Sequence, residues 1–313
     1  MSHQLQTVRD FVRFSMSEMA RANCHFGHGM LNAFDESVFL VLASLELPPD
    51  HIDPFWDAQL VDREITHLLS LIDQRCRLKI PSAYLLGQTW LGGLKFKSDA
   101  RALVPRSLLV EALDQLIGNT ETEQWPNVAL VFETAKPKIL DLCTGGASIA
   151  IVASHRLNAA GVKGHFLASD ISKDALTLAR ENIKDHGMTT QIKLLESDLF
   201  NSFKASDKFD LILCNPPYVN AESIRALPAE FKHEPIGALA SGLDGMEFTA
   251  RLLKELSQRL RANGSLLLEI GNEANYFEAL VAHLAKTDNV AFDFQYIEVT
   301  AGKNMVVLID APV

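Results

Sequence analysis

The first 85 residues of the chain carry a helical pattern of hydrophobic positions. Apolar residues three or four positions apart, with charged residues between them, indicate helices that bury one face. Two runs show this spacing: Val8, Phe11, Val12, Phe14 and Met19, and then Leu60, Ile65, Leu68, Leu69 and Ile72. Loops are expected where Gly27, Gly29 and the pair Pro48 and Pro49 interrupt the pattern. We therefore predict a small helical domain over residues 1–85.

The next segment is short and interrupted by glycine. Two apolar stretches, 89–91 and 94–96, lie on either side of Gly92 and Gly93, which is typical of a β-hairpin. Residues 86–107 are therefore predicted to form a hairpin linker. The acidic stretch at 118–136 is predicted to be a spacer.

From residue 138 onwards, short apolar strands alternate with helical segments. Strands are expected at 139–143, 166–169, 191–196, 209–214, 265–270, 291–298 and 304–309. A first helix is expected to follow the first strand and to end at about residue 157, and further helices are expected at 172–186, 246–261 and 274–285. This alternation implies an α/β domain over residues 108–313, built on a doubly wound, mostly parallel, seven-stranded sheet. Ligands bind such sheets at the carboxyl ends of the strands.

The composition is that of an ordinary folded protein. A chain of 313 residues favours about two domains, and 48% hydrophobic with 22% charged residues excludes disorder. No apolar run approaches the ~18–20 residues of a membrane helix, and the start of the chain lacks an apolar signal region. The four cysteines have no C-x-x-C spacing, which disfavours a zinc site and a disulfide framework. We expect a cytoplasmic protein with no metal and no membrane contact.

The formal charge bears on the choice of partner. Lysine and arginine number 29 and aspartate and glutamate 39, which gives a net charge of −10. Nucleic acid attracts basic surfaces, and the chain has no run of lysine and arginine, so we expect no stable binding to nucleic acid. A net negative charge can attract a basic protein, although it also serves solubility alone.

Candidate binding residues follow the first three strands of the α/β region. Small residues after the first strand, at Cys143, Thr144 and Gly145, let a backbone approach a ligand, and the next helix offers free N–H groups. The dinucleotide fingerprint G-x-G-x-x-G is absent. Asp141 precedes the glycines, which suits a ligand with an amino group, such as S-adenosylmethionine; the alternative is an ordinary tight turn.

The second and third strands also end in acids. Asp170, followed by Ile171, is expected to accept hydrogen bonds from ribose hydroxyls, while Ser172 is expected to cap the next helix. Asp198 can accept from an adenine amino group while Leu199 packs on the ring, although such residues also abound in loops.

The fourth strand ends in the most specific motif of the chain, Asn215, Pro216, Pro217 and Tyr218. Two prolines remove two N–H donors and fix the backbone, so the turn is rigid and presents carbonyl oxygens. The Asn215 amide can both accept and donate. We predict that Asn215 and the Pro216 carbonyl hold a planar NH₂ group, with Tyr218 packed against it. The alternative is a proline turn that only closes the strand.

These strand-end motifs resemble those of the class I S-adenosylmethionine-dependent methyltransferases. Asn-Pro-Pro-Tyr resembles the motif of the branch that methylates exocyclic or amide nitrogen in DNA, RNA or protein glutamine. The resemblance implies S-adenosyl-L-methionine as methyl donor and S-adenosyl-L-homocysteine as product. It implies catalytic roles for Asn215, Pro216, Pro217 and Tyr218, and cofactor-binding roles for Asp141, Cys143, Thr144, Gly145, Asp170, Ile171, Asp198, Leu199 and Asn215.

The helical domain and hairpin resemble the HemK-type protein glutamine N-methyltransferases. Segments similar to their PrmB subgroup, which acts on ribosomal protein three of the large subunit, lie at 7–13, 27–36, 103–107 and 227–245. The resemblance implies the same substrate here. We predict that the helical domain recognises it, because a glutamine amide is the same in every protein; the alternative is that these helices only cap the fold. Release-factor glutamine methyltransferases and, less favoured, nucleic-acid exocyclic-amine methyltransferases stay as alternatives.

Three further positions bear on the site. Arg106 is expected near the substrate entrance, or else as a surface arginine after a proline turn. Glu234 is expected to shape the same entrance, or else to be a solvated loop acid. Ala147 stands where the family usually has glycine, which puts an additional methyl group at the start of a helix.

Overall fold

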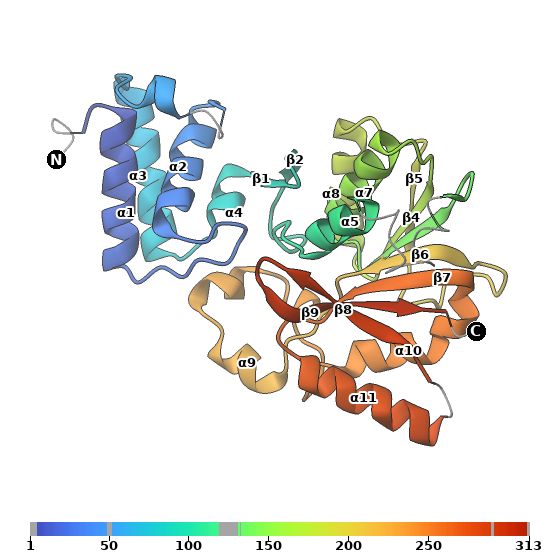
Figure 1. The fold of residues 1–313 in the computed structure, drawn as a ribbon. Helices are drawn as coiled ribbons and strands as arrows, with labels where there is room; N and C mark the ends of the chain where they lie inside the picture. The colour runs from blue at the N-terminus through green and yellow to red at the C-terminus, as the bar shows by residue number, and fades with distance from the viewer. Residues whose placement is uncertain (1–4, 49–51, 119–130, 132, 289–290, 312–313) are drawn as a thin grey trace.

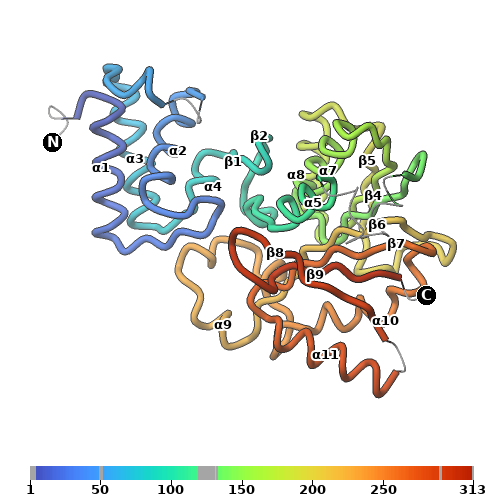
Figure 2. Tube along the Cα trace, in the orientation of Figure 1, coloured from blue at the N-terminus to red at the C-terminus, as the bar shows by residue number. Residues whose placement is uncertain are grey.

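The computed structural model describes residues 5–48, 52–118, 131, 133–288 and 291–311. Helices gather at one end of the molecule and a twisted sheet with helices on both faces forms the other (Figure 1). The tube trace shows the chain passing from the first part to the second through a small hairpin (Figure 2). Most of the predicted acidic spacer lies outside the described residues. Within the described residues, no helix combines the length and apolar character needed to cross a membrane.

The N-terminal part consists of helices, as predicted. They are α1 (Val8–Arg21), α2 (Ala33–Ser44), the 3-10 turn η2 (Asp53–Phe55), α3 (Asp62–Arg77) and α4 (Ser82–Leu86). Thr7 caps α1, and its side chain and that of Asp10 satisfy each other's backbone N–H groups. The apolar faces meet in one core, in which Phe11, Leu40 and Leu68 are buried.

The hairpin consists of β1 (Gln88–Leu91) and β2 (Leu94–Lys97), which pair antiparallel. Gly92 and Gly93 form its turn with positive φ angles of 57° and 79°, a conformation that glycine adopts readily. Residues 98–107 then run as a loop towards the sheet.

The large sheet has seven strands in the order β5-β4-β3-β6-β7-β9-β8. Its members are β3 (Lys138–Leu142), β4 (His165–Asp170), β5 (Ile192–Glu196), β6 (Phe209–Cys214), β7 (Leu260–Glu269), β8 (Phe294–Val299) and β9 (Gly302–Asp310). The first five are parallel, whereas β9 is antiparallel to both β7 and β8. The strand order reverses between β3 and β6, so the fold places its ligand crevice at the ends of these two strands.

Helices cover both faces of the sheet (Figure 1). They are α5 (Leu109–Gly118), α7 (Ser148–Ala159) and α8 (Lys173–Asp185) on one face, and α10 (Glu247–Arg259) and α11 (Ala274–Thr287) on the other. Because both faces are covered, the central strands are mostly apolar, and β6 is buried along its whole length. The predicted doubly wound, mostly parallel fold is confirmed.

The long loop after β6 (residues 219–245) carries α9 (Ala221–Ala226), η3 (Ala229–His233) and η4 (Ile236–Ala238). Its far end returns to its start, because Val219 N–H donates to Leu239 O at 2.8 Å and Ser241 N–H donates to Val219 O at 3.1 Å. The loop therefore stays beside the end of β6.

Candidate active site

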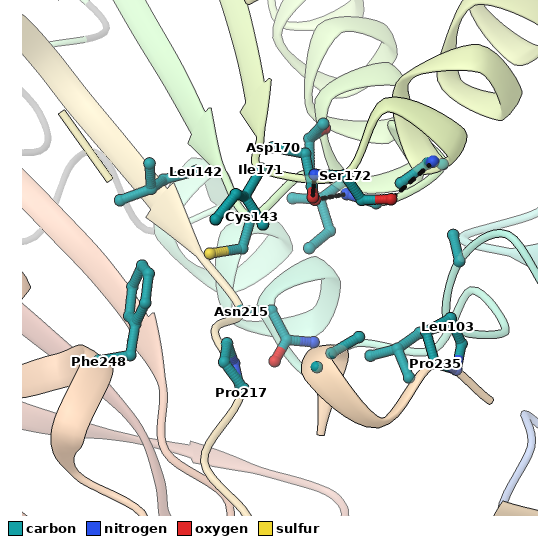
Figure 3. Close-up of a pocket in the computed structure, with 18 of the residues that line it drawn as sticks. Leu103, Leu142, Cys143, Asp170, Ile171, Ser172, Asn215, Pro217, Pro235 and Phe248 are labelled. Carbon is teal, nitrogen blue, oxygen red and sulfur yellow. Dashed lines mark hydrogen bonds between the residues drawn. The ribbon is translucent and has the colours of Figure 1, made fainter. Parts of the chain in front are cut away.

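A cavity of about 510 Å³ opens at the carboxyl ends of the parallel strands, within the usual size range of small-molecule sites. Its walls come from the segments 101–107, 142–149, 170–175, 197–199, 215–217 and 235–251. Figure 3 shows Cys143, Asp170 and Asn215 around the same space. The structure thus brings the ends of β3, β4, β5 and β6 together, as the sequence predicts.

The turn after β3 is tightly wound. Cys143, Gly145 and Ala147 have positive φ angles of 61°, 53° and 63°, which brings backbone rather than side chains to the cavity wall. Cys143, Thr144 and Gly145 line the cavity. The methyl group of Ala147 does not line it and packs into the apolar core.

Asp141 lies behind this turn and not in the cavity wall. It is fully buried, and its Oδ2 accepts hydrogen bonds from the Thr144 hydroxyl and the Ala150 N–H. Its Oδ1 has no partner among the described residues. Burial raises the pKa of this carboxyl group to about 7, and its hydrogen bonds only partly offset that effect. In the structure Asp141 stabilises the turn through these two hydrogen bonds. We predicted that it contacts the ligand directly, but it does not line the cavity.

Asp170 ends β4 and lines the cavity. Oδ2 accepts the Gly145 N–H at 2.8 Å and Oδ1 accepts the Ser172 N–H at 2.9 Å, while burial raises the pKa. Each oxygen keeps a second lone pair for a ligand hydroxyl. Ser172 caps α8 through the Ala175 N–H at 3.2 Å, as predicted.

The walls next to Asp170 offer flat apolar surface. Ile171 is 67% exposed and Leu199 is buried at a positive φ of 49°, and both line the cavity together with Phe248. Asp198 also lines it, and both its oxygens accept from Arg251 Nη2, at 2.8 and 2.9 Å. Phe248 and Arg251 were not predicted. The helix that carries them was expected, but only the packing of α10 turns this face to the cavity.

Asn215 and Pro217 line the cavity at the end of β6, and Pro216 is buried. The Asn215 side chain points into the open space in Figure 3. Within the described part of the chain, no hydrogen bond engages its amide group. A polar group held by a rigid turn, with its donor and acceptor both available, is suited to grip a second amide or amine.

The structure does not bring Tyr218 into the cavity, which corrects the expected packing against the acceptor. Its hydroxyl donates to Glu269 Oε1 at 3.0 Å. Its ring lies so close to Gly271 that a Cβ atom there would be 2.6 Å away. The chain turns this side chain behind the proline turn, against the end of β7.

Glu269 was missed by the sequence analysis. This buried carboxylate also accepts from the Ser107 hydroxyl at 2.7 Å and the Leu108 N–H at 3.0 Å. Burial raises its pKa. Glu269 therefore connects the end of β7 with Tyr218 and with the start of α5. Its position at the carboxyl end of a parallel strand was the available signal.

Arg106 and Glu234 form an ion pair in which the carboxylate is buried and the guanidinium is partly buried. Arg106 lines the cavity, and its Nη1 and Nη2 donate to Glu234 at 2.7 and 2.6 Å. Burial opposes ionisation of Glu234, but the nearby His28 ring and the hydrogen bonds from Arg106 outweigh it and lower the pKa to about 2. The alternatives of a surface arginine and a solvated loop acid are therefore wrong. Among the described residues, no cluster of His, Cys, Asp and Glu is arranged to hold a metal ion.

These residues fit S-adenosylmethionine. Asp170 offers acceptors for hydroxyl groups, Ile171 and Phe248 offer apolar surface for a flat ring, and the turn at 143–145 allows close backbone approach. The fold and the site define a class I methyltransferase, and a family model described as a methyltransferase domain matches residues 133–303. S-adenosylmethionine is the methyl donor of this class.

The closer family follows from sequence comparison. The ribosomal protein uL3 glutamine methyltransferase of Bordetella pertussis is 43% identical over 88% of this chain and 88% of its own length. That of Neisseria gonorrhoeae is 38% identical over 98% of this chain and 95% of its own. The chain belongs to this family of methyltransferases. Among solved structures, the catalytic domain of hMettl16 in complex with MAT2A 3'UTR hairpin 6 is 16% identical and covers 82% of this chain and 84% of its own, with a TM-score of 0.49.

Proposed function

We propose that the protein methylates the side-chain amide nitrogen of a glutamine in ribosomal protein uL3. The observation that carries this proposal is the unengaged amide of Asn215 at the cavity wall, on the turn formed by Pro216 and Pro217. The relatives, which match most of the chain, are glutamine methyltransferases of uL3, and they supply the substrate.

The main task of the protein in this reaction is to orient the substrate amide towards the methyl group. An amide nitrogen is a poor nucleophile because its lone pair is delocalised. S-adenosylmethionine supplies an electrophilic methyl group on a sulfonium. In our proposal Asn215 Oδ1 and the Pro216 carbonyl accept the two hydrogens of the substrate amide and aim its nitrogen. Such positioning contributes ~7–11 kcal/mol in favourable model reactions, and the same acceptors stabilise positive charge that develops on nitrogen. We assign no general base, because an N-protonated amide is acidic enough to release its proton to water.

For the donor, we assign Asp170 to the ribose hydroxyls and Ile171, Leu199 and Phe248 to the adenine ring, with Asp198 at its edge. Cys143, Thr144 and Gly145 face the methionyl part, while Asp141 shapes their turn from behind. Tyr218 belongs to the support of the proline turn through its hydrogen bond to Glu269.

We assign substrate selection to the helical domain, residues 1–85. A glutamine amide is the same in every protein, so discrimination needs a larger surface. The net charge of −10 suits a basic ribosomal protein, and it disfavours nucleic acid as the substrate. A protein of this kind would act in the cytoplasm, where ribosomal proteins are assembled.

The test is methyl transfer from labelled S-adenosylmethionine to purified uL3, with release factor and ribosomal RNA as competing acceptors. We expect one methyl group on one uL3 glutamine, located by peptide mass spectrometry. Label in RNA, or in release factor at equal rate, would refute the uL3 assignment. A protein without Asn215 that still methylates uL3 would refute the assignment of the site.

A further inference from the structure

The carboxylate of Glu234 joins three segments that are far apart in the sequence. Besides the two bonds from Arg106, it accepts the Val104 N–H at 3.0 Å. His28 Nε2, from the helical domain, lies 3.4 Å from its Oε2. The ring of His28 packs on that of Phe231, with centroids 4.4 Å apart, and the Arg106 guanidinium lies 5.3 Å from the same ring. One buried carboxylate thus contacts the helical domain, the loop before α5 and the loop after β6.

Two of these segments line neighbouring parts of the cavity wall. Leu103, Val104, Pro105 and Arg106 line the cavity from the loop before α5. Pro235, which follows Glu234 directly, lines it from the loop after β6, together with Gly237, Ala238, Ala240 and Ser241. Figure 3 shows Leu103 and Pro235 on the same side of the space as the Asn215 amide. The relative position of these two wall segments is therefore set by the groups around Glu234.

A second buried pair connects the same loop to the helical domain. Arg75 is 1% exposed, and it donates to Glu36 on α2, to Glu230 at 3.0 Å and to the His25 carbonyl at 2.8 Å. Glu230 also accepts the His25 N–H at 2.9 Å. Buried ion pairs tolerate little change of geometry, since a displaced partner leaves a charge uncompensated. The loop after β6 is thereby held to the helical domain at Glu230 as well as near Glu234.

We propose that Glu234 is a positioning residue for methyl transfer: through Arg106, Val104 and His28 it fixes the acceptor side of the cavity against the helical domain. The proposal rests on the function proposed above for its substrate. Glu234 does not line the cavity, so it acts through the walls it holds together. The helical domain then contributes to the geometry of the active site as well as to substrate selection.

The test compares Glu234→Gln with wild type in three measurements. Glutamine keeps an oxygen for the Val104 N–H but loses the charge and presents N–H groups to Arg106 or His28. We expect kcat with uL3 to fall about ten- to a hundredfold, because displacement of about 1 Å can cost that much. The Kd for S-adenosylmethionine should stay within about twofold, because the groups assigned to the donor are untouched. Amide hydrogen exchange should accelerate at 236–241 and stay unchanged at 142–150.

The matched control is Glu222→Gln, a fully solvated carboxylate in the same loop, which should change none of the three. His28→Phe tests the helical-domain contact separately, because it keeps the ring on Phe231 and removes the imidazole nitrogens. It should lower kcat in the same direction, and the double variant should lose less than the sum of the two effects. The single variant His28→Phe also keeps the proposal testable if Glu234→Gln fails to fold.

Hydrogen exchange needs no substrate, so it separates the two proposals. Suppose that the variants exchange faster at 236–241 but the wild-type protein does not methylate uL3. That result would overturn the proposed function and leave the structural role of Glu234 intact. Unchanged exchange and unchanged kcat in both variants would overturn the positioning role. A rise of KM with unchanged kcat would also overturn it, since that result indicates uniform substrate binding only.

Discussion

Gly145 donates its backbone N–H to the carboxylate of Asp170 across 2.8 Å. This bond connects the turn after β3 with the end of β4 at the floor of the cavity. Asp170 therefore has two roles, because it accepts from Gly145 and also lines the cavity in which the donor's ribose is proposed to lie. A change at this carboxylate affects the turn and the ligand together.

Asp170→Ala should weaken binding of S-adenosylmethionine by about ten- to a hundredfold. A hydrogen bond to a charged group contributes ~1.5–3 kcal/mol, and each 1.4 kcal/mol changes a dissociation constant about tenfold. Isothermal titration calorimetry measures the change. The dissociation constant of Asp170→Asn, which keeps one acceptor oxygen, should lie between those of wild type and Asp170→Ala.

The matched control for this prediction is Asp174→Asn, an exposed acid in the first turn of α8. It should leave the dissociation constant as it is. A dissociation constant of Asp170→Ala within about twofold of wild type would mean that the carboxylate only supports the turn.

Asp141 should make the protein less stable as the pH rises. Its pKa is about 7 when folded and 3.8 as its ordinary value, so between these values the folded state binds more protons than the unfolded state. Stability from this group is present below about pH 4 and is lost as the pH rises through 7. With 1.36 kcal/mol per pKa unit, the loss between pH 5 and pH 8 is about 2–3 kcal/mol.

Urea unfolding of wild type and Asp141→Asn at pH 5 and pH 8 measures this term. Asparagine keeps an oxygen for Thr144 and Ala150 but does not ionise, so the free energy of unfolding of the variant should fall less between the two pH values. Equal slopes in both proteins would show that Asp141 is already ionised at pH 5.

Most of the fold could be predicted from the spacing of apolar residues. The run at 209–214 is apolar except for Asp210 and is β6, which is buried at every position. The helical repeat that starts at Val8 is α1. The short helices α5 and α9 were not predicted. The helix was expected to run to Arg261 and the next strand to start at Ser265. Instead β7 begins at Leu260, which pairs with Phe209 of the neighbouring strand.

Site residues could be predicted where the direction of a strand alone places them at the cavity. They could not be predicted where their position depends on which distant side chain they bond. Asn215, Asp170 and Gly145 line the cavity because they follow parallel strands that end together. Glu234 and Arg106 are 128 positions apart, so no local pattern indicates their pairing. The side chain of Tyr218 follows the same strand as Asn215, yet Glu269 draws its hydroxyl away from the cavity.

Ala147→Gly should change stability by less than about 1 kcal/mol and leave donor affinity unchanged. Its φ of 63° costs a non-glycine residue roughly 1–2 kcal/mol. Loss of a buried methyl group costs about 0.8 kcal/mol, and the added freedom of glycine in the unfolded state about 0.5–1 kcal/mol. The opposing effects nearly cancel. Affinity should hold within about twofold because the methyl group packs into the core. A much tighter complex of the variant with S-adenosylmethionine would mean that the methyl group distorts the turn.

Asn215→Ala should reduce methyl transfer by at least a hundredfold while S-adenosylmethionine still binds within about threefold of wild type. The amide of Asn215 has no other partner among the described residues, so its removal leaves no buried group unsatisfied and should not disturb folding. What is lost is the acceptor that aims the substrate amide, a contribution of about 2.7 kcal/mol if the effect is a hundredfold.

Asn215→Asp separates orientation from shape, because it keeps an acceptor oxygen at the same place but adds charge and removes the donor. Single-turnover kinetics with saturating donor measure the chemical step directly. If Asn215→Ala turns over within about tenfold of wild type, Asn215 does not hold the acceptor, and the amide on the proline turn serves another purpose.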